Sequence, residues 1–158
     1  MWINGVAAYS ISNITFNHTV DTYSTIGTSI HGPTSEFWNG YISNFRVVKG
    51  VALYRSTFAP PTTPVTACPG TSLLLNFDNY GIYDASRTQD LTLINDVKTS
   101  AITTHYNSPT LAFDGSGDYY IPSEPLAFNF LNEDWTIEMW LYLNTVSGFQ
   151  LIWEGRPG

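Results

Sequence analysis

The chain has 158 residues, the usual size of one domain, and its 43% hydrophobic and 15% aromatic residues are enough to form a buried core. Its formal net charge is −7, and its six Lys and Arg residues form no cluster that could hold a phosphate backbone, which excludes nucleic acid and an anionic membrane surface as expected partners. No segment approaches the ~20 consecutive apolar residues of a membrane-spanning helix, so we expect no membrane insertion.

The N-terminal residues predict a hairpin. Asn4-Gly5 lies between apolar residues and is typical of a two-residue turn, so we expect a hairpin within residues 1–12. The same residues lack the basic and apolar regions of a signal peptide, and none is expected here. Residues 13–33 are polar and predict short strands and loops. Two Asn-X-Thr triplets, at Asn13 and Asn17, match the N-glycosylation pattern, which matters only in a secreted eukaryotic protein.

Residues 38–48 predict the first long strand. Alternation places Tyr41, Ser43, Phe45 and Val47 on one face and Ile42, Asn44, Arg46 and Val48 on the other. Lys49-Gly50 ends this strand, and residues 51–55 are expected to form a single helical turn.

A proline-rich segment then divides the chain. Residues 58–70 contain four prolines, and proline cannot lie in a central strand because it lacks the N–H donor. We therefore expect an extended connector between two halves, residues 1–66 and residues 67–158. The single cysteine, Cys68, lies in this connector, can form no internal disulfide and is interpreted as a bystander thiol.

The second half predicts a series of short strands. We expect them at residues 72–77, 91–94, 111–113, 119–121, 135–143 and 148–153. Residues 84–90 are expected to form a polar loop. Asp114-Gly115-Ser116-Gly117-Asp118 predicts a turn, with residues 119–121 as the strand that returns from it. No segment shows a sustained helical period, so the chain predicts an antiparallel all-β sandwich or barrel.

Six stretches carry a family resemblance: Asn39–Gly50, Ala52–Tyr54, Phe58–Pro61, Thr71–Phe77, Phe113–Tyr119 and Trp135–Trp140. They resemble laminin G-like repeats of the concanavalin A-like lectin/glucanase superfamily, in particular repeats of bacterial surface proteins and tailed-phage structural proteins. The resemblance implies an antiparallel jelly-roll β-sandwich and a location on a virion or a cell surface. It indicates a function only weakly, because one fold supports many activities.

The order of these stretches differs from that of the family they resemble. The family's closing motifs come first, up to about residue 64, and its opening motifs follow from about residue 70. Three explanations remain open: a fragment that straddles two tandem repeats, a circular permutant, or halves that borrow strands from another chain. Two isolated half-sandwiches would expose apolar faces and unpaired edges, so we favour one composite sandwich, with association between copies as an alternative.

The strand at residues 135–143 carries the candidate ligand site. Trp135, Ile137, Met139 and Leu141 form an apolar face that is expected to pack into the core, and Thr136, Glu138, Trp140 and Tyr142 form the other face. Related glucanases hold sugars with a glutamate beside aromatic rings. The predicted ligand-binding residues are therefore Trp38, Tyr119, Glu138 and Trp140. The alternatives are core or interface aromatics and a structural Glu138 paired with Arg46.

The glycine-rich turn carries a candidate metal site. Asp114 and Asp118 place two carboxylates in one tight turn, and calcium prefers oxygen ligands. Laminin G-like modules often bind calcium, so the resemblance implies calcium here; the alternative is an ordinary turn. No other cofactor is expected. The remaining candidates, Asp78, Asn79, Asp84, His18, His31 and His105, are interpreted as turn formers and loop histidines.

Three function hypotheses follow. The first is a carbohydrate-binding or adhesion module of a surface or virion protein. The second is a structural assembly module, such as a fibre, decoration or capsid-associated element, whose partners are other copies of the chain. The third, a glycoside hydrolase, needs two carboxylates, and the strand supplies Glu138 alone, so we expect no enzymatic activity.

Overall fold

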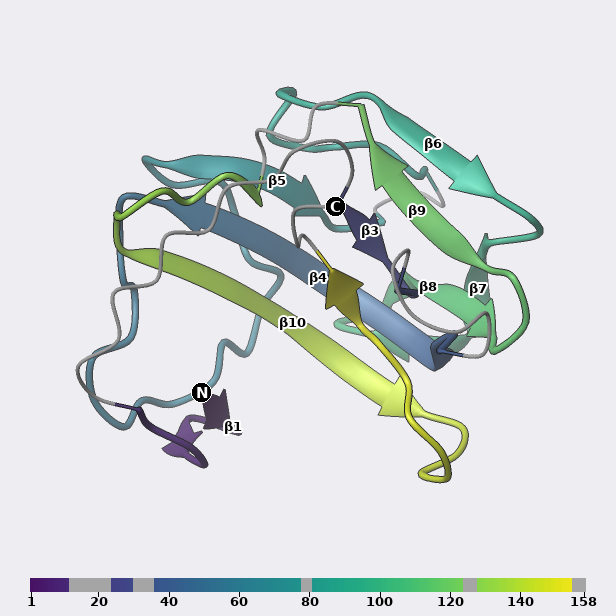
Figure 1. Cartoon of the computed structure of the whole chain (residues 1–158), viewed down its shortest axis with the longest axis horizontal. Coiled ribbons are helices and arrows are strands. Elements are labelled where there is room, and N and C mark those ends of the chain that lie inside the picture. Colours follow the sequence, from purple (N-terminus) through teal and green to yellow (C-terminus); the bar gives the residue numbers. More distant parts are fainter. Residues whose placement is uncertain (12–23, 30–35, 78–80, 124–127, 155–158) are drawn as a thin grey trace.

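A computed structural model describes residues 1–11, 24–29, 36–77, 81–123 and 128–154 of the chain. In these residues the protein is all-β and antiparallel, and it forms no helix (Figure 1). The predicted helical turn at residues 51–55 is wrong, because this segment is a loop. Its backbone is held by Thr136, whose hydroxyl accepts from Leu53 N and donates to Val51 O. Both glycosylation triplets, His18 and His31 lie outside the described residues.

The N-terminal hairpin is present as predicted. Strands β1 (Trp2–Ile3) and β2 (Val6–Ala7) pair across Asn4 and Gly5, which have φ values of 50° and 77°. The hairpin rests on the loop after β4, where Phe58 N donates to Gly5 O at 3.0 Å. A Cβ on Gly5 would lie 1.8 Å from Phe58 O, so only glycine permits this approach.

The larger sheet has five strands. Four of them follow one another in the order β10 (Trp135–Leu143), β4 (Asn39–Lys49), β8 (Ser108–Asp114) and β7 (Lys98–His105). The fifth, β5 (Thr71–Leu75), pairs with the later residues of β4, after those that pair with β8. β4 precedes the proline-rich connector, whereas β10, β8 and β5 follow it. Strands from both halves of the chain therefore share one sheet.

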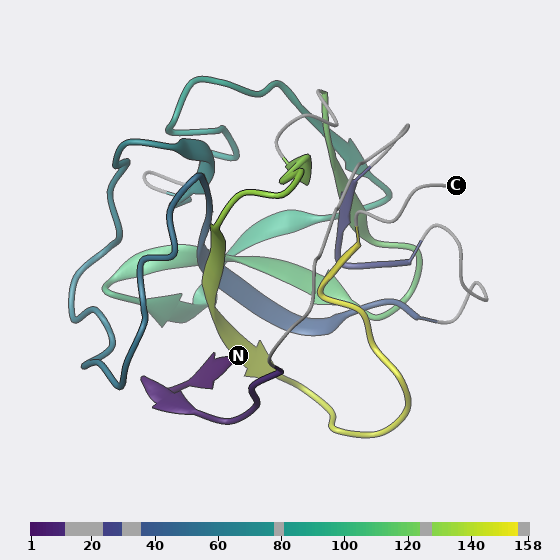
Figure 2. The ribbon, with the colours of Figure 1, turned by 60° about the vertical axis from the view of Figure 1, so that its left-hand side comes forward.

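The smaller sheet has four strands. They are β11 (Trp153–Glu154), β3 (Thr25–Ile26), β9 (Tyr119–Pro122) and β6 (Leu91–Ile94), in that order. The core contains Ile26 and Tyr120 from this sheet together with Ile42, Phe45 and Leu111 from the larger one. The two sheets thus face each other across one core, which gives the protein its β-sandwich character (Figures 1 and 2).

The glycine-rich turn does not form a hairpin. Strand β9, which follows it, pairs with β6 and β3 of the smaller sheet and not with β8. Gly115 and Gly117 have φ values of 86° and 81°, and the turn between them carries the chain from one sheet to the other. The prediction that residues 119–121 return beside residues 111–113 is therefore wrong. At the C-terminal end, Trp153 is the one residue of the predicted strand 148–153 that lies in a strand, β11, which continues to Glu154.

A β-bulge at Asn44 changes the faces of β4. Arg46 is opposite Glu138 but Ser43 is opposite Trp140, so β4 has one residue more than β10 between these pairs. Asn44 has a φ of 51°, and asparagine tolerates this conformation better than most residues. The alternation shifts as a result, and the core receives Ile42, Phe45 and Val47. The prediction that Ile42 and Phe45 lie on opposite faces is wrong for this reason.

The bulge predicts an unusual order of stability. Asn44 Oδ1 accepts from buried Val65 N at 3.1 Å. Asn44→Ala loses this bond and also strains the backbone, so we expect the free energy of unfolding to fall by about 2–4 kcal/mol. Asn44→Gly loses the same side-chain hydrogen bonds, including the one from Asn44 Nδ2 to Ser43 Oγ at 2.8 Å, but does not strain the backbone, and we expect a fall of about 1–2 kcal/mol. Urea denaturation measures both. Glycine is normally worse than alanine in a strand, and that normal order would contradict the bulge.

Candidate functional site

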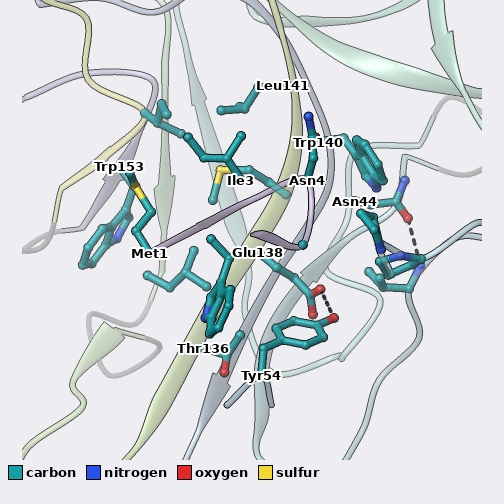
Figure 3. Close-up of a pocket in the computed structure, with 18 of the residues that line it drawn as sticks. Met1, Ile3, Asn4, Asn44, Tyr54, Thr136, Glu138, Trp140, Leu141 and Trp153 are labelled. Atoms are coloured by element: carbon teal, nitrogen blue, oxygen red, sulfur yellow. Dashed lines mark hydrogen bonds between the residues drawn. The ribbon is translucent and has the colours of Figure 1, made fainter. Parts of the chain in front are cut away.

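Glu138 lies on the outer face of β10 and has both oxygens engaged. Arg46 Nε donates to Glu138 Oε1 at 2.6 Å, and a second guanidinium nitrogen completes the ion pair. The Tyr54 hydroxyl donates to Oε2 at 2.7 Å (Figure 3). The exposed fractions of the Arg46 and Glu138 side chains are only 10% and 16%. The pairing of Glu138 with Arg46 is therefore confirmed, and Glu138 as a ligand-binding residue stays a prediction.

Tyr54 and Arg46 connect this pair to the loop and the connector. Burial, together with the hydrogen bond and charge of Glu138, raises the pKa of Tyr54 to about 12, so its hydroxyl remains a donor at neutral pH. Arg46 also donates to Thr66 O at 2.5 Å. The Tyr54 ring stacks on Phe58 with a centroid distance of 3.7 Å. No sequence pattern connects Tyr54 with Glu138, because the two residues are 84 positions apart.

Trp140 shares this face with Glu138, as predicted, and belongs to an aromatic cluster. Its ring centroid lies 4.4 Å from that of His105 and 6.1 Å from that of Tyr106. Burial lowers the pKa of His105, which favours the neutral imidazole. His105 was expected in a loop but is the last residue of β7. The Tyr106 hydroxyl donates to Pro61 O, so the cluster also touches the connector.

The other two predicted ligand residues lie elsewhere. Trp38 is 3% exposed and belongs to the core, so it offers no surface for a sugar ring; its prediction as an exposed aromatic is wrong. Tyr119 begins β9 in the smaller sheet, opposite Ile94. The structure therefore brings together Glu138 and Trp140 only.

Asp114 and Asp118 are joined by Asp96, which was not among the predicted metal ligands. Carboxylate oxygens of the three lie within 4.8 Å of one another. Burial raises the pKa of Asp118, and the neighbouring charge of Asp114 raises it further. Asp118 Oδ2 accepts a hydrogen bond from Asp114 N at 3.0 Å, and Lys98 Nζ lies 3.6 Å from Asp96 Oδ2. Calcium takes about six to eight oxygen ligands, and these three carboxylates can supply only part of that number. Calcium binding therefore stays a prediction that rests on the family resemblance.

Asp84 organises a polar loop and is a turn former, as predicted. Its carboxylate accepts from the backbone N–H groups of Leu74, Ser86 and Thr88 at 2.8–2.9 Å. Burial by itself raises the pKa of Asp84, but these bonds and that from the Ser86 hydroxyl lower it below its usual value. Asp78 and Asn79 lie outside the described residues.

An apolar groove runs beside β10 and has a volume of about 880 Å³. It lies between the N-terminal hairpin, β10 and residues 150–153, and the residues labelled in Figure 3 include Met1, Ile3, Leu141 and Trp153. Ile137 and Met139 pack against the core as predicted. Trp135 is 38% exposed but stacks on Phe130 of the core with a centroid distance of 4.9 Å, whereas the prediction is wrong for Leu141, which is 37% exposed.

No family model, curated protein or solved structure matches the chain. The laminin G-like resemblance and the jelly-roll topology it implies therefore stay predictions. In the part of the chain that the structure describes, no helix is long and apolar enough to span a membrane.

The two Arg–carboxylate pairs on this side of the molecule should differ strongly in their contribution to stability. Glu138→Gln leaves Arg46 buried without its counter-charge, so we expect the free energy of unfolding to fall by about 3 kcal/mol. Asp134→Asn removes the partner of Arg55 in a pair whose side chains are 72% and 53% exposed, and we expect a change below about 0.5 kcal/mol. Chemical denaturation compares the two, and equal losses would show that Glu138 is not a structural anchor.

Proposed function

We propose that the protein is a non-catalytic binding module that acts in assembly or adhesion at a virion or a cell surface. The observation that carries this proposal is the open apolar groove beside β10. Soluble monomers rarely leave a large contiguous apolar surface exposed, and such a surface is typical of a contact with another molecule. Other copies of the chain are the proposed partners.

The exposed residues around the groove support a protein partner. Leu141 and Leu143 of β10 are 37% and 44% exposed, and Met1 and Ile3 of the hairpin are 70% and 56% exposed. Phe149, in the segment after β10, is 67% exposed. Burying such side chains against a second protein is favourable by roughly 25 cal/mol per Å² of apolar surface removed from water.

Catalysis is not part of the proposal. Glycoside hydrolysis needs an acid and a second carboxylate on opposite sides of the scissile bond. Both oxygens of Glu138 are instead bonded to Arg46 and Tyr54. This pairing favours a structural use of the carboxylate over a catalytic one.

Carbohydrate binding is the second candidate, and the aromatic cluster around Trp140 favours it. The Trp140 ring is partly exposed and has His105 and Tyr106 beside it. Sugar rings pack on such aromatic planes. On a glycan array, we expect a sugar-binding protein to lose its signal with Trp140→Ala and to retain it with Leu141→Lys. A blank array with the unaltered chain would exclude this candidate.

Assembly through the groove predicts a specific effect of charge. Leu141→Lys places an ammonium group in the groove, whereas Ile102→Lys makes the same type of change on β7, where Ile102 is 93% exposed. In sedimentation at increasing concentration, we expect the unaltered chain and Ile102→Lys to associate reversibly and Leu141→Lys to stay monomeric. Association that is the same in both variants, or a strict monomer for the unaltered chain, would contradict the proposal.

A further inference from the structure

The outer edge of β10 differs from the other sheet edges of the described residues. β6 and β11 are short, and β7 carries Lys98 and an irregularity between Ser100 and Thr104. The outer edge of β5 is covered, because Leu74 bonds to Asp84 and Ala85. Natural proteins protect sheet edges by such means, since an unprotected edge recruits another strand.

β10 has none of these protections. It is nine residues long, or about 30 Å at ~3.4 Å per residue, and it contains neither proline nor lysine. Its one charged residue, Glu138, is neutralised by Arg46. β4 pairs with one edge, and no strand of the described residues pairs with the other.

The alternation of the backbone shows which groups face this edge. Asn144 N donates to Asn39 O, so the N–H of this even-numbered residue points toward β4. Successive N–H groups alternate along a strand. The N–H and C=O groups of Ile137, Met139 and Leu141 therefore point away from β4, toward the groove.

The N-terminal hairpin forms the opposite wall of the groove. Figures 1 and 2 place it on the side of β10 away from β4. Met1 and Ile3 line the groove together with Ile137, Met139 and Leu141. No backbone hydrogen bond joins the hairpin to β10 in the described residues. The groove thus combines a line of free backbone groups with apolar walls and no unpaired charge on β10.

We infer that this groove accepts one extended β-strand of another polypeptide, which pairs with β10 as an added strand. This inference rests on the proposed function and specifies its contact. Backbone bonds to Ile137, Met139 and Leu141 supply the pairing, and the apolar inner side selects apolar side chains at every second position of the strand. The side toward Glu138 and Tyr54 carries polar groups and selects hydroxyl-bearing side chains. An acidic strand is disfavoured by the net charge of −7.

The probe is a synthetic peptide of alternating threonine and valine with one lysine at each end. Amide hydrogen exchange is followed by NMR in the full chain. We expect the peptide to slow exchange at Ile137, Met139 and Leu141 by at least about tenfold. Exchange at Glu138 and Trp140, whose N–H groups face β4, should stay unchanged. This odd–even pattern is the signature of an added strand.

Two variants control the experiment. Leu141→Pro removes an N–H that faces the groove and spares the bonds to β4, so we expect it to weaken peptide binding about tenfold. Val146→Pro places the same residue type in the loop after β10, where Val146 is 90% exposed and outside the groove, and it should bind as the unaltered chain does. If Leu141→Pro fails to fold, the exchange pattern of the unaltered chain still decides.

The outcomes separate this inference from the proposed function. Concentration-dependent association without odd-residue protection by the peptide would overturn strand addition and leave assembly in place. Protection of odd and even residues alike would mean general stabilisation and would also overturn it. A groove that takes up detergent but not the peptide would identify a binding site for apolar molecules and overturn it. Odd-residue protection that Leu141→Pro abolishes would support it.

Discussion

The ion pair between Arg46 and Glu138 is the interaction on which this side of the molecule depends. It joins the two long strands of the larger sheet, which come from opposite ends of the chain, and the same guanidinium holds the connector at Thr66. Tyr54 adds the loop that in turn carries the hairpin through Phe58. A buried pair of this kind is costly to break, because either partner alone would leave an uncompensated charge. Glu138, which was predicted as a ligand-binding residue, is thus one member of this anchor.

The open part of the molecule lies beside this anchor. β10 pairs with β4 along one edge, and in the described residues the groove lies between its other side and the N-terminal hairpin. The inner side of β10 is then only partly covered, with Ile137 and Met139 against the core and Trp135 and Leu141 exposed. A sandwich that is closed around most of its core and open along one edge is suited to accept a partner, and the binding proposals follow from that geometry.

Sequence patterns predicted the elements that depend on local chemistry. The Asn4-Gly5 turn, the strand at residues 135–143 and the absence of strand in the proline-rich segment all follow from backbone preferences of single residues. Local patterns failed where the structure of a segment depends on the strand that pairs with it. β7 was missed because its turn uses Tyr106 and Asn107 at positive φ rather than glycine, and the faces of β4 shifted at a bulge that only its partner strand reveals.

The sequence by itself determined that the chain is all-β, that a connector divides it and that Glu138 and Trp140 share a face, because alternation and proline chemistry act over a few residues. Only the tertiary structure decided that strands of both halves share one sheet, that Trp38 is buried and that Asp96 joins Asp114 and Asp118. It also decided that, among the described strands, none pairs with the outer edge of β10. These features depend on pairings between residues far apart in the chain, and a local pattern contains no information about which distant strand supplies the partner.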